Sequence, residues 1–322
     1  MLRLSDATAE AIRDLDEHWN GKGNPKGTKG EKISLLGRIC GLAQSVEVFL
    51  SEKGLPSALK MACERRAKWF DPQIVDALLT FQSDTDFWSG LRCNDLIGKI
   101  SLWEPPDEIL TADEEGVDRV AEAFAQVVDA KSPWTFQHST RVAEIAVGIG
   151  TQFGCSEAML RDIRRVGLLH DIGKLGVSNK ILDKPGKPTD EEFAQIKKHP
   201  EYSYRILKQV HAFDQLAEVA GGHHERLDGR GYFRGVLADQ ISFSTRVLTV
   251  ADIFEALTAK RPYRDAMDCE QALSILNGDI GKGIDGDCLA ALQHWHAKTS
   301  INSRVELQLD AIEKYSSSLS TL

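Results

Sequence analysis

Apolar residues recur along most of this chain three or four positions apart, which is the spacing of one face of an α-helix. Residues 139–150 show the pattern with four apolar positions on one side: Val142, Ile145, Ala146 and Ile149. Residues 115–130 and 159–170 repeat it. The spacing predicts three amphipathic helices, each with one face turned toward a core.

The polar residues between these segments indicate where helices begin and where loops lie. Thr189 followed by Glu192 forms a capping box, which is typical of a helix start, and the apolar residues after it predict a helix through Ile196. Three glycines mark a loop within residues 226–240: Gly229, Gly231 and Gly235. Strand signals are few, so we predict an all-α fold.

The chain also contains an internal repeat. Residues 15–49 match residues 223–257 at a constant offset of 208, with nine of the 35 positions identical. Identical pairs include the following: Glu17 and Glu225, Gly23 and Gly231, Arg38 and Arg246. The match resumes later at an offset of 214, where Asp71 stands opposite Asp285. The shared order of these matches argues for two related helical units rather than a chance recurrence of glycines.

Composition and charge exclude several classes of protein. The chain has 322 residues, of which 42% are hydrophobic and 27% charged, with 39 basic and 48 acidic side chains for a net charge of −9. An acidic chain of ordinary composition is not typical of disorder or of DNA binding. The sequence has no run of 18 apolar residues and no apolar signal-peptide segment, and its six cysteines form no CxxC. We therefore expect a cytoplasmic protein that neither crosses nor binds a membrane.

Two of the carboxylates lie in strongly apolar surroundings. Asp252 stands between Val250-Ala251 and Ile253-Phe254, and His170-Asp171 follows another apolar run. Burying a carboxylate costs several kcal/mol unless it is paired or bound to a metal. Several His and Asp residues on apolar faces of successive helices can share one metal site. A donor set of imidazole and carboxylate suits Fe, Mn, Co, Ni or Zn, and the sequence does not choose among them.

The motifs LLHDIGK (168–174), HPEYS (199–203) and HHERLDGRGY (223–232), in this order, resemble the HD-GYP branch of the HD-domain metal phosphohydrolases. Asp252 and RPYR (261–264) fit the same pattern. The resemblance implies an HD-superfamily helical bundle and hydrolysis of a bacterial cyclic dinucleotide. The N-terminal half-repeat makes the layout similar to the tandem HD-GYP arrangement of bacterial 3′,3′-cyclic GMP-AMP phosphodiesterases.

The resemblance also implies two divalent transition-metal ions, with Mn or Fe expected. One ion would be held by four residues: His138, His170, Asp171 and Asp252. The other would be held by three: His199, His223 and His224. Asp171 would bridge the two ions, which would share an attacking hydroxide as in other two-metal phosphohydrolases.

Four further residues would contact substrate by the same resemblance. Lys174 would neutralise the reacting phosphate, Arg261 and Arg264 would bind the second phosphate, and Tyr232 would stack on or hydrogen-bond the dinucleotide. Each has a structural alternative. Lys174 is also suited to a helix C-terminus, the two arginines to a solvated face, and Tyr232 to packing within its loop.

The sequence departs from the family pattern at three positions. Phe233 follows Gly231-Tyr232 where the family has proline, and a proline would fix the loop where phenylalanine leaves it freer. Ser203 stands where the family usually has glycine, which we interpret as a minor change. Trp134 occupies the position of a glutamate found in three-metal members. An indole binds no metal, so we predict two ions.

The first copy lacks the chemistry of the second. Leu15, Asp16 and Gln44 stand opposite His223, His224 and Asp252, and the half that carries the His-Asp motif is missing. We predict a degenerate, non-catalytic unit at 1–100, a linker at 101–112 and a catalytic unit at 113–322. Five apolar residues of the first unit are available to pack on the catalytic unit or on a second chain in a homodimer: Leu35, Leu36, Ile39, Leu42 and Val46. Asp16 and His18 form a pair that could bind something but is more typically solvated.

The function predicted is that of a phosphoric diester hydrolase that linearises 3′,3′-cyclic GMP-AMP, cyclic di-GMP or both. Two alternatives remain open. One is a nucleotidase or other phosphomonoesterase of the HD superfamily, against which the GY loop and RPYR argue. The other is a non-catalytic dinucleotide sensor or scaffold, against which the intact set of candidate ligands argues.

Overall fold

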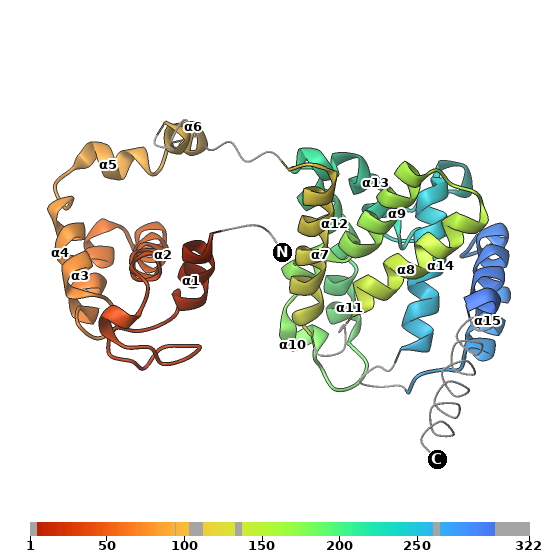
Figure 1. The fold of residues 1–322 in the computed structure, drawn as a ribbon, viewed down its shortest axis with the longest axis horizontal. Helices are drawn as coiled ribbons and strands as arrows, with labels where there is room; N and C mark the ends of the chain where they lie inside the picture. Colours follow the sequence, from red (N-terminus) through yellow and green to blue (C-terminus); the bar gives the residue numbers. More distant parts are fainter. Residues whose placement is uncertain (1–4, 94, 103–111, 133–136, 260–264, 300–322) are drawn as a thin grey trace, which may run out of the picture. The chain divides into compact units, whose positions relative to one another are not determined.

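A computed structural model describes residues 5–93, 95–102, 112–132, 137–259 and 265–299 of the chain. Within these ranges the chain forms helices joined by loops and contains isolated β-bridges but no strand. The predicted all-α fold is therefore confirmed. The chain divides into two compact units, residues 1–111 and 112–322, each with its own apolar core (Figure 1).

The first unit is built around α2 (Leu35–Lys53) and α3 (Leu55–Arg65), the two helices that follow the glycine loop. Its other helices are α1 (Asp6–Asp14), α4 (Pro72–Thr80), α5 (Thr85–Gly90) and α6 (Leu96–Ser101). Leu42, Val46 and Leu50 on α2 pack with Met61 and Val75 in its core. The expectation that Leu42 and Val46 face another unit or chain is thus wrong, since both are buried within their own unit, whereas Leu35, Leu36 and Ile39 are exposed.

The second unit is a larger helical bundle. Its helices are α7 (Glu114–Ala130), α8 (His138–Gln152), α9 (Glu157–Leu169), α10 (Asn179–Leu182), α11 (Asp190–Ile196), α12 (His199–Leu207), α13 (Ala217–Gly222), α14 (Phe243–Thr258), α15 (Cys269–Asn277) and a helix over 286–299. Short 3₁₀ turns lie at Ile172–Gly176, His211–Leu216 and Ala238–Gln240. The predicted helices at 115–130, 139–150 and 159–170 correspond to α7, α8 and α9, and the Thr189–Glu192 capping box is present.

The internal repeat is also a repeat of contacts. The Asn20–Lys29 bridge of the first unit recurs as Asp228–Leu237 in the second, at the offset of 208. The ion pair between Arg38 and Asp71, 2.6 Å, recurs between Arg246 and Asp285, 2.9 Å. Both units therefore retain this backbone bridge and this ion pair.

Some predicted features lie outside the described residues: Trp134, Arg261, Arg264 and most of the predicted linker. Every helix within the described ranges is too short or too polar to cross a membrane.

Candidate metal centre

The structure brings together all seven residues that the sequence singled out as metal ligands. His138 begins α8, His170 and Asp171 follow α9, His199 begins α12, His223 and His224 follow α13, and Asp252 lies within α14. Six of them are buried, with exposed fractions of 7% or less, and His224 is half-buried. Residues from five separate helices thus meet at one point in the core.

The cluster has two parts. His138, His170 and Asp252 offer ligand atoms within 4.8 Å of one another, and so do His199, His223 and His224. Asp171 lies between the parts: its Oδ2 is 3.3 Å from His138 Nε2, and its Oδ1 is 3.2 Å from His199 Nε2. One carboxylate therefore faces both groups of imidazoles.

Backbone carbonyls orient three of the imidazole rings. The Nδ1 atoms of His170, His199 and His223 donate to the carbonyl oxygens of Gly167, Ile196 and Ala220 at 2.7, 2.7 and 2.5 Å. A carbonyl only accepts hydrogen bonds, so the proton of each neutral ring lies on Nδ1. Each Nε2 lone pair is left toward the cluster, which is the usual arrangement for a histidine that binds a metal.

His138 is oriented by a residue that the sequence analysis missed, Glu255. The His138 Nδ1 lies 2.5 Å from Glu255 Oε2, and the other carboxylate oxygen accepts from Arg141 at 2.8 Å. Glu255 is only 1% exposed. Its position three residues after Asp252, in the same apolar helix, is the signal that would have found it, because residues three apart share a helix face.

A divalent metal fits this cluster. His170 Nε2 and Asp171 Oδ1 are buried and make no hydrogen bond, although leaving such atoms unsatisfied costs about 1–3 kcal/mol each. Imidazole nitrogens and carboxylate oxygens, without thiolate, suit divalent transition metals. The cluster thus has the donors and the unsatisfied buried atoms expected of a metal site.

The protonation states of three histidines and of Asp171 agree with this interpretation. Burial lowers the pKa of His170, and it holds those of His223 and His224 well below their usual range, which favours neutral imidazoles. Burial raises the pKa of Asp171, but Lys174 and the surrounding histidines outweigh it and hold that pKa well below the ordinary value. His138 differs: burial is outweighed by hydrogen bonds to Asp171 and Glu255, which raise its pKa to about 9, so this ring would release a proton on binding a metal.

Close backbone packing holds the His170-Asp171 segment in place. Ser203 Oγ donates to the His170 carbonyl at 2.6 Å and accepts from Gly173 N at 2.9 Å. A β-carbon at Gly173 would lie 2.0 Å from the His199 carbonyl oxygen, so only glycine fits there. Ser203, which we had interpreted as a minor departure, ties α12 to the segment that carries two candidate ligands.

Lys174 and Tyr232 border the cluster. The Lys174 ammonium forms an ion pair with Asp171, and the Lys174 side chain is 21% exposed. The Tyr232 ring packs against His224, with centroids 4.7 Å apart. The described residues thus bring Lys174 and Tyr232 to the candidate ligands, while Arg261 and Arg264 lie outside the described ranges.

Phe233 gives the signature loop a backbone conformation that proline cannot adopt. Its φ is +97°, whereas proline is fixed near −65°. The Phe233 ring packs on Tyr204, with centroids 5.7 Å apart, and the Arg234 guanidinium lies over both rings. The predicted freedom of this loop is therefore restricted by aromatic packing.

Comparison with known proteins agrees with the fold. The HD domain family model matches residues 2–74 and 122–288. The chain is 45% identical over 292 residues, 91% of its length, to the 3′3′-cGAMP-specific phosphodiesterase 3 of Vibrio cholerae, and it covers 64% of that protein. It is 34% identical over 194 residues, 60% of its length, to the cyclic di-GMP phosphodiesterase response regulator RpfG of Xanthomonas campestris, and it covers 50% of that protein.

Among solved structures, the crystal structure of the cyclic GMP-AMP specific phosphodiesterase V-cGAP3 of V. cholerae matches with a TM-score of 0.62 and 42% identity. That match covers 92% of this chain and 69% of the other. The chain spans less than two thirds of the length of the two relatives matched by sequence. The family match covers well over half of this chain, and the motifs and the fold agree with it. The chain belongs to the HD domain family.

Proposed function

We propose that this chain is a metal-dependent phosphodiesterase that opens a cyclic dinucleotide, with 3′,3′-cyclic GMP-AMP as the preferred substrate and cyclic di-GMP as the alternative. The observation that carries the proposal is the convergence of four Nδ1-anchored imidazoles and two buried carboxylates on one point. The names of the relatives support the substrate class, and the 45% identity to a cyclic GMP-AMP phosphodiesterase supports the preference.

The cluster would hold two divalent ions, Mn or Fe. His138, His170 and Asp252 would hold one ion, and His199, His223 and His224 the other. Asp171 would serve both, since each of its oxygens lies within 3.3 Å of a histidine of a different group. Such ions supply charge stabilisation to phosphoryl oxygens and a water nucleophile of lowered pKa.

The remaining residues would bind and orient the dinucleotide. The partly exposed Lys174 side chain reaches the centre, and we assign it the role of neutralising the reacting phosphate. The Tyr232 ring lies beside His224 and offers a surface for stacking. Arg261 and Arg264 keep their predicted role at the second phosphate, where two guanidinium groups suit a phosphodiester.

The first unit would not catalyse. Leu15 and Gln44 cannot replace His223 and Asp252 as ligands, since an alkyl group binds no metal and an amide carries no charge. Residues 1–100 therefore keep the role of a structural or regulatory partner of the catalytic unit, joined to it by residues 101–112.

A parallel hydrolysis assay tests the proposal. The full chain, loaded with Mn²⁺ or Fe²⁺, is incubated with 3′,3′-cyclic GMP-AMP and with cyclic di-GMP, and the products are separated by chromatography. We expect turnover of at least one dinucleotide and its loss in Asp171→Ala. Hydrolysis of nucleoside monophosphates alone would favour a nucleotidase. Binding without turnover, in protein shown to hold two ions, would favour a sensor.

A further inference from the structure

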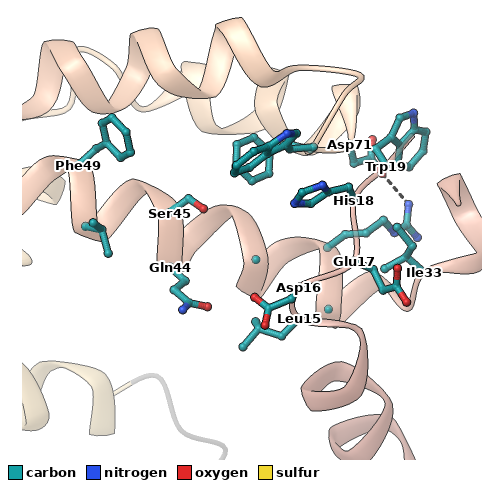
Figure 2. Close-up of a pocket in the computed structure, with 16 residues that line it drawn as sticks. Leu15, Asp16, Glu17, His18, Trp19, Ile33, Gln44, Ser45, Phe49 and Asp71 are labelled. Atoms are coloured by element: carbon teal, nitrogen blue, oxygen red, sulfur yellow. Dashed lines mark hydrogen bonds and ion pairs between the residues drawn. The ribbon is translucent and has the colours of Figure 1, made fainter. Parts of the chain in front are cut away.

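The first unit contains a cavity of about 210 Å³ at the position that corresponds, through the repeat, to the metal centre of the second. Leu15 and Gln44, the counterparts of His223 and Asp252, both line it. Figure 2 shows four other side chains that matter here, which come from the loop after α1 and from α2: Asp16, His18, Ser45 and Phe49. Trp69, from the segment before α4, also lines the cavity. Where the metal ligands are lost, a cavity lined with aromatic and polar groups remains.

One wall of this cavity is an aromatic stack. The His18 imidazole lies parallel to the Trp69 indole, with centroids 4.4 Å apart and an interplanar angle of 13°. The Arg65 guanidinium lies 3.9 Å from the centroid of the Trp69 ring. In the second unit the same three positions hold Arg226, Gly283 and Asp279, of which Arg226 and Asp279 form an ion pair at 2.9 Å. The first unit thus has an aromatic surface at the positions where the second unit has a compact ion pair.

Apart from Arg38, the polar groups that line the cavity are acidic or neutral. Arg38 forms an ion pair with Asp71 at 2.6 Å, although its buried Nε has no hydrogen-bond partner, and no other Lys or Arg lines the cavity within the described part of the chain. No described residue forms a hydrogen bond with the Asp16 carboxylate, the Gln44 amide or the Ser45 hydroxyl. Such a lining disfavours a phosphate and favours a flat, uncharged ring that donates hydrogen bonds to a carboxylate.

We propose that this cavity binds a guanine base. Guanine presents adjacent N–H donors on one edge, which a carboxylate accepts together, while adenine offers no such pair. The Asp16 carboxylate would accept from this edge, the His18–Trp69 stack would pack against the base, and Gln44 would bond its remaining polar atoms. A volume of 210 Å³ is below the range of sites for drug-sized ligands, so a base fits and a whole dinucleotide does not. Any ribose or phosphate would lie outside.

Calorimetry on the full chain tests this, with guanosine, GMP and adenosine as probes. We expect guanosine and GMP to bind alike and adenosine at least about tenfold more weakly, as one base-specific pair of hydrogen bonds provides. Asp16→Asn is expected to weaken guanosine binding at least about tenfold. Glu52→Gln, a matched exposed carboxylate on α2 outside the cavity, is expected to change nothing. Trp69→Ala removes the aromatic wall and should also weaken binding about tenfold.

Asp171→Asn separates this proposal from the catalytic one. That variant should lose dinucleotide hydrolysis and keep guanosine binding, because the cavity lies entirely within the first unit. Three results would overturn the proposal: no binding of guanosine at millimolar concentration, equal binding of guanosine and adenosine, or unchanged guanosine affinity in Asp16→Asn. Because Asp16 is exposed, its substitution leaves the core intact, and circular dichroism verifies the fold of each variant.

Discussion

The two copies of the repeat share their framework and differ in their chemistry. In both, a glutamate after a short helix accepts from a backbone N–H nine residues later, Glu17 from Lys26 and Glu225 from Arg234, each at 2.7 Å. Both pair an arginine with the aspartate that caps a later helix. Yet Leu15 and Gln44 stand where the second copy has His223 and Asp252. The residues that build the loop are thus retained independently of the candidate metal ligands.

The environment of one helix face explains part of this difference. On α14 the side chains of Val247 and Glu255 are buried, because α8 packs against this helix. Their counterparts on α2 are Ile39, which is 41% exposed, and Glu47, which is also exposed. A buried carboxylate must be partnered, whereas an exposed one is solvated. Glu255 therefore has a defined partner in His138, and Glu47 needs none.

The largest expected effect is on hydrolysis, and it comes from giving the second copy a residue that the first copy has. Asp252→Gln removes a carboxylate from the His138–His170 group and inserts the side chain found at Gln44. We expect at least about a hundredfold loss of hydrolysis, since loss of an outer partner alone typically costs 10–100-fold. Metal content by elemental analysis should fall with it. Full metal content and activity would show that Asp252 is not a ligand.

The next largest effect is on metal affinity, and it is expected at Glu255, whose counterpart in the first copy is Glu47. Glu255→Gln weakens the acceptor that orients His138, so we expect metal affinity about 10–100-fold lower by competition with a chelating dye. Glu47→Gln, at the equivalent exposed position, is the control and should leave metal affinity unchanged. If both variants bind the metal with equal affinity, Glu255 does not position His138 for metal binding.

A smaller effect is expected in the signature loop, where Gly23-Asn24-Pro25 stands opposite Gly231-Tyr232-Phe233. Phe233→Pro cannot keep a φ of +97°, so it should displace Tyr232 and lower kcat/KM about tenfold. Phe233→Gly permits the same backbone conformation and should retain more activity. If the proline variant is fully active, the position of Tyr232 is not important for turnover.

The smallest effect is on stability. Burial raises the pKa of Asp285, but the Cys288 and Asp287 N–H groups and Arg246 outweigh it and lower that pKa. The carboxylate therefore stabilises the fold above the usual Asp pKa of about 3.9, and this contribution is lost as pH falls through the lower folded value. Asp285→Asn keeps a helix cap and loses the ion pair with Arg246, so we expect about 1 kcal/mol lower unfolding free energy at pH 7.

Urea unfolding at pH 7 and at pH 3 measures this difference. The gap between Asp285→Asn and the parent chain should narrow at the lower pH, because the unfolded parent chain takes up a proton at this carboxylate more readily than the folded chain does. Asp287→Asn, whose side chain is exposed, serves as the comparison and should show a smaller gap at pH 7. A gap for Asp285→Asn that is the same at both pH values would contradict the assigned ion pair.

Sequence patterns predicted helices well because periodicity and caps are local. The spacing at Val142, Ile145 and Ile149 placed α8, and Thr189 with Glu192 placed the start of α11. The same reasoning can place Glu255 on the helix face of Asp252, but it could not assign the partner of Glu255 or of Ser203. Each acts on a residue far away in the chain, Glu255 on His138 and Ser203 on His170, and only packing brings those pairs together.

The sequence by itself determined the helical class, the repeat and the set of histidines and aspartates, because each of these is written in residue type and spacing. The tertiary structure decided which ring nitrogens face the cluster, which carboxylate orients His138, and that Asp16 and His18 border an aromatic cavity rather than solvent alone. These depend on side chains from separate helices meeting at hydrogen-bond or stacking distance, and no local pattern fixes that distance.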